Sequence, residues 1–348
     1  MGDPTFVLAS ASPVSAFPLH KKILFWAVLL SLPASAAAGL WAFWRSRHLD
    51  LPSGKKLNKA AWEESFRERG LRVPRDGPRD GYWGKNMPAW TRDPEIGWHE
   101  SEAHIPRLVE QDASGLQRVE APGARWHVLI LGGSVAWGAY ASTIRTSYFS
   151  QLAERLAASG HPVRITVLAA GAWTSENELK AFRTRGLALG PDVALFLNGM
   201  NDLTQGKDVS EDTRVARYLD HMHEARDVAE TKGVAVVFAL QPALDGKRHK
   251  TRIEERVADL MADKAAFVPT AYPRMRTGLG GLASHPGTAV VDCSDAFSAE
   301  RATTFTDIWH FADPGHRLLA ECLAAGLQPV LDGRPARPPD AGMSQKSH

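Results

Sequence analysis

The sequence predicts a three-layer α/β/α domain built around a doubly wound, mainly parallel sheet. Five short apolar runs alternate with helical patterns, at residues 127–131, 163–168, 193–197, 234–240 and 289–292. Continuous apolar runs are typical of parallel strands that helices cover on both faces. Ser134, Gly171 and Asn201 follow three of these runs, at the strand ends where doubly wound sheets bind ligands. We therefore expect a five-stranded sheet with flavodoxin-like order.

The helical patterns between the strands have recognisable starts and ends. Phe149, Leu152 and Leu156 lie on one face of a predicted helix, which is expected to stop at Gly160. The next helix is expected to begin at Ser175-Glu-Asn-Glu178, because this stretch has the pattern of a capping box.

Length and composition favour one large domain with a long N-terminal extension. The chain has 348 residues, of which 44% are apolar, and this is ample for a packed core. We expect five parts: an N-terminal segment (1–22), an uncharged apolar segment (23–44), a linker and extension that packs on the domain (45–125), the α/β domain (126–331) and a proline-containing disordered tail (332–348).

The uncharged segment at 23–44 predicts export. Its 22 residues are enough to cross a bilayer at about 1.5 Å per residue. It also divides into an apolar run, Ile23–Leu32, and a small-residue stretch, Pro33–Ala36, as a cleavable signal peptide does. Both a signal anchor and a secreted, cleaved form remain open. Flanking Lys and Arg residues favour a cytoplasmic domain, but long domains translocate largely regardless of charge, so we expect a periplasmic or extracellular one.

Several other functions are disfavoured. The net charge is +2 and the basic residues are scattered, which does not indicate a nucleic-acid partner. The stretch Gly132–Gly138 fits neither a dinucleotide-binding nor a Walker A pattern, and His221 and His223 lack the spacing of zinc ligands. No metal or organic cofactor is expected. Cys293 and Cys322 either pair in an oxidising compartment or remain buried thiols.

Three separate stretches carry the groups that acyl transfer needs. Ser134 follows the first apolar run, and Asp307 precedes His310 by three residues, which supplies a nucleophile, a base and a group that orients the base. Asn201 follows the third run, where its amide can donate to an oxyanion. Each stretch alone is weak evidence, since similar sequences occur in phosphate sites and simple turns. Their combination is far more specific.

These stretches, in this order, resemble the SGNH/GDSL hydrolase family over about residues 126–324. Ser134 corresponds to the family's nucleophile, in a Gly-Gly-Ser variant of Gly-Asp-Ser, and Asn201 lies in a Gly-x-Asn-Asp block. Asp307 and His310 match the closing Asp-x-x-His block, so the resemblance implies a catalytic triad of Ser134, His310 and Asp307.

The family's second block is the least well matched. Members usually show Asn-x-Gly-x-x-Gly there, whereas this chain has Ala169–Ser175, and Gly171 is the expected backbone donor. The resemblance thus implies an oxyanion hole of the Ser134 N–H, the Gly171 N–H and the Asn201 side chain.

The implied function is a membrane-anchored or exported serine esterase acting on an acyl or acetyl ester. The ester partner could be an envelope carbohydrate or a lipid, and Trp83, Trp90 and Trp98 of the extension are candidates for contact with a sugar. Two alternatives stay open: an envelope carbohydrate O-acyltransferase that uses the same serine, and a non-catalytic binding module on the same fold. The oligomeric state is left open.

Overall fold

The structure is a computed structural model, and the residues described from it are 54–75, 77–78, 90–93, 97–100, 116–205 and 209–337. The apolar segment at 23–44, together with Trp83 and the tail beyond 337, lies outside the described residues. Within them, no helix is both long enough and apolar enough to span a bilayer.

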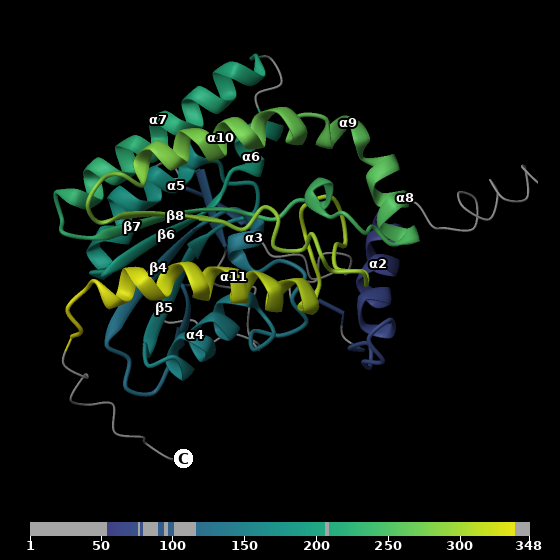
Figure 1. The fold of residues 1–348 in the computed structure, drawn as a ribbon, viewed down its shortest axis with the longest axis horizontal. Coiled ribbons are helices and arrows are strands. Elements are labelled where there is room, and N and C mark those ends of the chain that lie inside the picture. Colours follow the sequence, from purple (N-terminus) through teal and green to yellow (C-terminus); the bar gives the residue numbers. More distant parts are fainter. Residues whose placement is uncertain are drawn as a thin grey trace, which may run out of the picture. The chain divides into compact units, whose positions relative to one another are not determined.

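In the described part of the chain, a six-stranded sheet forms the centre of the domain (Figure 1), with the order β3-β5-β4-β6-β7-β8. The strands are β3 Gln117–Glu120, β4 Trp126–Gly132, β5 Val163–Ala169, β6 Val193–Asn198, β7 Ala235–Leu240 and β8 Thr288–Asp292. From β5 to β8 neighbouring strands are parallel, in the flavodoxin order. The fold class and the five parallel strands predicted from the apolar runs are confirmed.

The sixth strand, β3, corrects the predicted strand number. It pairs antiparallel with β5, from Gln117 opposite Val167 to Glu120 opposite Arg164. Its sequence, Gln-Arg-Val-Glu, has no apolar run because an edge strand buries little of its surface. Because we predicted strands from apolar runs, we placed these residues in the N-terminal extension.

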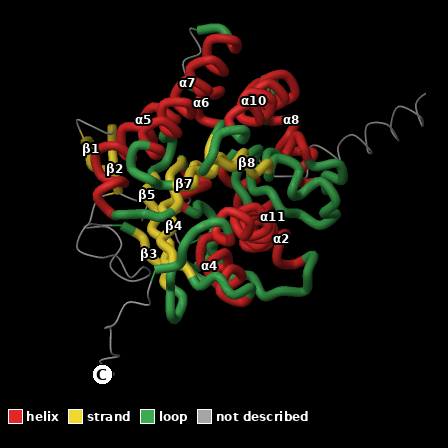
Figure 2. Tube along the Cα trace, turned by 60° about the vertical axis from the view of Figure 1, so that its left-hand side comes forward, coloured by secondary structure: helices red, strands yellow, loops and turns green. Residues whose placement is uncertain are grey.

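Two helix layers cover the sheet, and residues alternate between them along each strand. Val128 and Ile130 of β4 belong to the core beneath α4 (Tyr148–Ala158) and α11 (Asp313–Asp332). Leu129 and Leu131 belong to the core beneath α5 (Ser175–Ala181), α7 (Glu211–Glu230) and α10 (Val268–Leu282). Figures 1 and 2 show the strands between these two layers.

Shorter elements complete the described chain. They are α3 Ser134–Trp137, η2 Phe182–Gly186, η3 Leu187–Leu189, α6 Met200–Thr204, η4 Leu244–Gly246, α8 Arg252–Leu260 and α9 Ala262–Ala265. In the predicted extension, β1 (Trp90–Asp93) and β2 (Gly97–Glu100) pair as an antiparallel hairpin. The helix α2 (Lys55–Arg67) contacts α8 and buries Leu57 and Ala61 in the core.

The predicted start of α5 at Ser175 is confirmed, but the capping box lies one residue earlier than the sequence indicated. Thr174, not Ser175, is the N-cap, and its N–H donates to Asn177 Oδ1 at 3.1 Å. Ser175 and Glu178 are instead fully buried and bond to other parts of the fold. Asn177, not Glu178, is therefore the capping-box partner.

Two long-range links fix the last helix and the end of the described chain. Cys293, directly after β8, forms a disulfide with Cys322 of α11, which decides between the two states that the sequence left open. Beyond α11, Arg337 donates from Nε to Asp192 Oδ1 at 2.9 Å. Residues 332–337 of the predicted tail are thus described, and this ion pair connects them to Asp192.

Candidate active site

Ser134 begins α3, immediately after the central strand β4. Two glycines before it allow neighbouring strand ends to approach closely. A Cβ at Gly132 would lie 2.3 Å from the carbonyl oxygen of Leu197, and one at Gly133 would lie 2.4 Å from Asn201 Nδ2. The Gly-Gly-Ser sequence thus leaves room for the Asn201 amide beside the turn that carries Ser134.

Asp307 and His310 lie in the loop between β8 and α11, which is closed on itself by hydrogen bonds. The Thr306 N–H donates to the His310 carbonyl at 2.8 Å. Asp307 Oδ1 accepts the N–H groups of Trp309 at 3.0 Å and His310 at 2.8 Å. A three-residue spacing suits this geometry, because the carboxylate turns back to bind the backbone that follows it.

The structure brings the three predicted triad residues into one chain of hydrogen bonds. His310 Nε2 is 2.6 Å from Ser134 Oγ, and His310 Nδ1 is 2.8 Å from Asp307 Oδ2. Since a carboxylate only accepts, we assign the Nδ1–H as donor to Asp307, which leaves Nε2 as acceptor for the serine hydroxyl.

Asp307 is held in its ionised form although it is only 4% exposed. Burial alone would raise the pKa of Asp307, but the charge of His310 and the hydrogen bonds from His310 and Trp309 oppose this, and the pKa is lower than usual. The site therefore keeps a buried negative charge next to the imidazole.

An aromatic residue supports the imidazole from one side. The Tyr140 ring stacks on His310 with ring centroids 5.1 Å apart, and Tyr140 has a positive φ of 68°. Trp62 of α2 is buried and donates from Nε1 to the Tyr140 carbonyl at 2.9 Å. Nothing in the sequence indicated this contact, because Trp62 lies in the extension and Tyr140 in a turn.

Asn201 and Gly171, the two other predicted oxyanion residues, follow the strands on either side of β4. Asn201, in α6, donates from Nδ2 to the Trp173 carbonyl at 2.7 Å. Gly171 lies two residues beyond β5, in the turn that ends at Trp173, and the Ala170 N–H just before it donates to Gly132 O at 3.3 Å. The turn of Gly171 is thus tied both to β4 and to Asn201.

A buried polar cluster lies next to these two turns, and sequence reasoning missed it. The Asp202 carboxylate accepts the Ser175 N–H and hydroxyl, and Ser175 Oγ lies 2.7 Å from His221 Nδ1. Glu178, fully buried in α5, accepts from Asn198 at the end of β6. Burial, followed by the nearby charge of Asp202, raises the pKa of Glu178 well above its ordinary value.

A further histidine, His316, is bonded within the fold. His316 is fully buried in α11, and its Nε2 is 3.0 Å from the Ala139 carbonyl. Across the described ranges, no group of His, Cys, Asp and Glu residues has the arrangement of a metal site.

The doubly wound sheet and the hydrogen-bonded set at its strand ends define the class of protein: an α/β enzyme with the geometry of a serine hydrolase. In sequence, the chain matches the model of the GDSL-like Lipase/Acylhydrolase family over residues 130–318, more than half of its length. The chain belongs to this family and is an ester-hydrolysing enzyme.

Solved structures with a similar fold include several esterases. A lipase from a goat rumen metagenome is 14% identical, with a TM-score of 0.45, and the match covers 58% of this chain and 97% of that one. An acetyl xylan esterase is 15% identical, with a TM-score of 0.43 and coverage of 57% and 98%. A catalytic mutant of an acetylxylan esterase from Geobacillus stearothermophilus is 14% identical, with a TM-score of 0.43 and coverage of 59% and 95%. Sequence identities and TM-scores this low do not indicate the substrate of this chain. A comparison with curated proteins gives no match.

Proposed function

We propose that this protein is a serine esterase in which Ser134 is the nucleophile, His310 the general base and Asp307 the residue that orients the base. The observation that carries the proposal is the chain of two short contacts, 2.6 Å from Ser134 Oγ to His310 Nε2 and 2.8 Å from His310 Nδ1 to Asp307. A hydroxyl becomes an effective nucleophile when such a base takes its proton.

The reaction proceeds in two steps through an acyl-enzyme. His310 removes the Ser134 proton as Oγ attacks the ester carbonyl, and then passes that proton to the departing alcohol. A water molecule, activated by the same imidazole, releases the acid and frees the serine. Asp307 keeps the Nδ1–H tautomer and stabilises the imidazolium that forms in each step.

The oxyanion of the tetrahedral intermediate is stabilised by the Ser134 N–H, the Gly171 N–H and the Asn201 amide. The hydrogen bond to Trp173 uses one of the two N–H groups on Asn201 Nδ2 and holds the amide in place. The second N–H then serves the oxyanion, without reorganisation during the reaction.

The substrate is an acyl or acetyl ester, and the enzyme acts outside the cytoplasm, with residues 23–44 as its membrane anchor or cleaved signal. The Cys293–Cys322 disulfide supports this location, because disulfides persist mainly in oxidising compartments. The uncharged segment preceded by Lys21-Lys22 supports export independently.

Substitution of the triad tests the proposal. With p-nitrophenyl esters of increasing acyl length, Ser134→Ala and His310→Ala should each lower kcat by about a thousandfold or more, since the triad acts as a unit. Ser284→Ala and His285→Ala provide matched controls on an exposed turn and should retain full turnover. Near wild-type turnover in either triad variant, with folding intact, would refute the mechanism.

A second assay separates hydrolysis from transfer. With an acetylated glycan as donor and an unacetylated one as acceptor, an esterase releases acetate in proportion to donor consumed. Transfer of most acyl groups to the acceptor would instead identify an O-acyltransferase that uses Ser134.

A further inference from the structure

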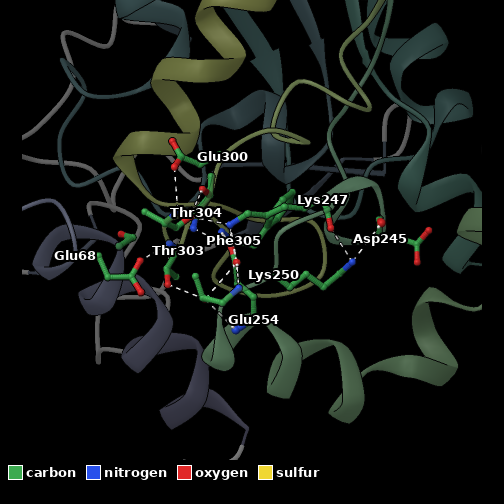
Figure 3. A network of polar contacts seen from close by, with 12 residues as sticks. Glu68, Asp245, Lys247, Lys250, Glu254, Glu300, Thr303, Thr304 and Phe305 are labelled. Carbon is green, nitrogen blue, oxygen red and sulfur yellow. Dashed lines mark hydrogen bonds and ion pairs between the residues drawn. The ribbon is translucent and has the colours of Figure 1, made fainter.

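The segment immediately before Asp307 is held by a buried carboxylate from another part of the fold. Residues 302–306 lead directly into the loop that carries Asp307 and His310, which we call the triad loop. Glu254 of α8 lies beneath this segment in Figure 3. Glu254 Oε1 accepts the backbone N–H groups of Thr304 at 2.8 Å and Phe305 at 3.1 Å. These contacts join residues that are about 50 positions apart in the sequence.

Glu254 is also paired with a buried cation. Lys247 Nζ donates to Oε1 at 2.7 Å and to Oε2 at 2.6 Å, and both side chains are 0% exposed. Lys247 Nζ further donates to the Ala302 carbonyl at 2.7 Å. Burial lowers the pKa of Lys247, and the charge of Glu254 opposes this effect. The pair therefore binds three backbone positions of the segment, at Ala302, Thr304 and Phe305.

Other elements hold the same stretch. The Glu68 carboxylate, at the end of α2, accepts the Thr303 N–H, and Arg69 Nη1 donates to the Thr303 carbonyl at 2.6 Å. Within the triad loop, the Ile308 carbonyl accepts the Leu244 N–H at 2.9 Å. Thus the backbone around Asp307 is bound on both sides by groups outside the loop.

Stability alone does not account for a buried ion pair here. Two well-packed apolar side chains usually stabilise a core as well as a buried ion pair, because desolvation offsets much of the attraction between the charges. What a carboxylate adds is direction, since its oxygens accept several N–H groups from fixed angles. Of the N–H groups bound by Glu254, that of Thr251 belongs to the capping box of α8. Those of Thr304 and Phe305 belong to the segment that carries the triad loop.

We propose that Glu254 is a positioning residue for the triad: through its bonds to Thr304 and Phe305 it fixes Asp307 and His310 relative to Ser134. The inference rests on the proposed function, since it concerns the geometry of the same reaction. Lys247 neutralises Glu254 and holds its carboxylate in the orientation that the backbone requires.

The test separates alignment of the site from stability of the fold. In the full chain, kcat is measured with p-nitrophenyl acetate per site titrated with a fluorophosphonate, and stability by thermal unfolding. Glu254→Gln should lower kcat by between about tenfold and a hundredfold, as misplacement by about 1 Å does, with KM within a few-fold. It should also lower Tm, because Lys247 is left buried without its counter-charge.

The double variant Lys247→Met with Glu254→Leu is decisive, because leucine has no oxygen to accept the Thr304 and Phe305 N–H groups. Two apolar side chains should keep Tm above that of Glu254→Gln, since no unpaired buried charge remains, while kcat per titrated site stays low because the acceptor is absent. If kcat returned together with Tm, Glu254 would have only a structural role, and the proposal would be overturned.

Two further variants complete the design. Glu255→Gln makes the same chemical change on an exposed neighbour in α8, and kcat and Tm should stay at wild-type values. Glu254→Asp keeps the charge but is one methylene shorter, so it tests reach with the ion pair retained, even if Glu254→Gln fails to fold. Its kcat should fall as well, and wild-type kcat in either Glu254 variant overturns the proposal. Failure of the proposed function would appear separately, as retained activity in Ser134→Ala.

Discussion

Asn201 is the residue at which a catalytic role and a structural role can be measured separately. Its amide lies against Gly133, where a side-chain Cβ would come within 2.4 Å of Nδ2, and it donates to the Trp173 carbonyl. The first contact brings the amide next to Ser134. The second ties the end of β6 to the turn after β5, which would stabilise the fold whether or not the site is catalytic.

We expect Asn201→Ala to lower kcat by about a hundredfold or more and to leave KM within a few-fold, because an oxyanion donor acts mainly in the transition state. Loss of the bond to Trp173 should also cost about 1 kcal/mol of unfolding free energy. Steady-state kinetics and urea denaturation on the same variant check both values.

Gln205→Ala is the matched control, since Gln205 Nε2 donates to the Ala172 carbonyl of the same turn at 2.6 Å from an exposed position. It should leave kcat unchanged. A stability loss in Asn201→Ala without a fall in kcat would remove Asn201 from the oxyanion hole.

Glu178 gives the fold a pH dependence that can be tested. Burial, followed by the charge of Asp202, raises the pKa of its carboxyl, so the folded state keeps a proton that the unfolded state releases above its ordinary pKa of about 4.3. Stability from this group is therefore present at acid pH and is lost as pH rises toward the raised pKa. In Glu178→Gln, which cannot ionise, we expect Tm relative to wild type to increase as pH rises from the ordinary carboxyl pKa of about 4.3 into the neutral and alkaline range.

Thermal unfolding across that pH range measures the effect. Glu176→Gln, on the same helix but exposed and paired with Lys180 at 2.6 Å, should follow the wild-type pH profile. Parallel curves for wild type and Glu178→Gln would show that Glu178 titrates normally.

At the scale of elements, the sheet positions one part of the site, and a long loop bound by other elements positions the other part. Ser134, Gly171 and Asn201 follow three adjacent parallel strands, β4, β5 and β6, so the sheet itself fixes their spacing. Asp307 and His310 lie on a long connection between β8 and α11. That connection depends on side chains from α2 and α8 and on the disulfide for its position.

The disulfide links the two ends of the chain segment that carries Asp307 and His310. It joins Cys293 to Cys322, 29 residues apart, and the loop between them contains both Asp307 and His310. Replacing both cysteines by alanine should lower the free energy of unfolding by about 3 kcal/mol, because the unfolded chain gains the freedom that the link removes. Urea denaturation with and without reductant measures this difference.

Reductant should destabilise wild type but leave the double alanine variant unaffected. An unchanged urea midpoint for wild type under full reduction, verified by thiol labelling, would contradict a stabilising role for the link.

At the scale of the whole molecule, the open point is where the domain lies relative to the membrane. Our proposal predicts that protease added to intact spheroplasts digests the domain if residues 23–44 remain as an anchor. If the segment is cleaved, the domain should appear in the soluble periplasmic fraction. A cytoplasmic protein of the same cells serves as the control for lysis. Protection of the domain in intact spheroplasts would show that the Lys and Arg flanking the segment set the orientation.

The sequence by itself determined the parallel strands and the positions of Ser134, Asn201, Asp307 and His310 at or near loop starts. It could do so because a strand buried on both faces needs an uninterrupted apolar run, and the end of each run marks the edge where ligands bind. It missed β3, since an edge strand need not be apolar, and it placed the capping box of α5 one residue too late.

Only the tertiary structure decided which distant residues meet. The Cys293–Cys322 link, the stacking of Tyr140 on His310 and the hold of Glu254 on Thr304 and Phe305 join segments from different elements. The spacing of apolar residues indicates which face of a helix or strand is buried, because that face follows from the local geometry of the element. It does not indicate which distant residue a side chain contacts, because that depends on how whole elements pack against each other.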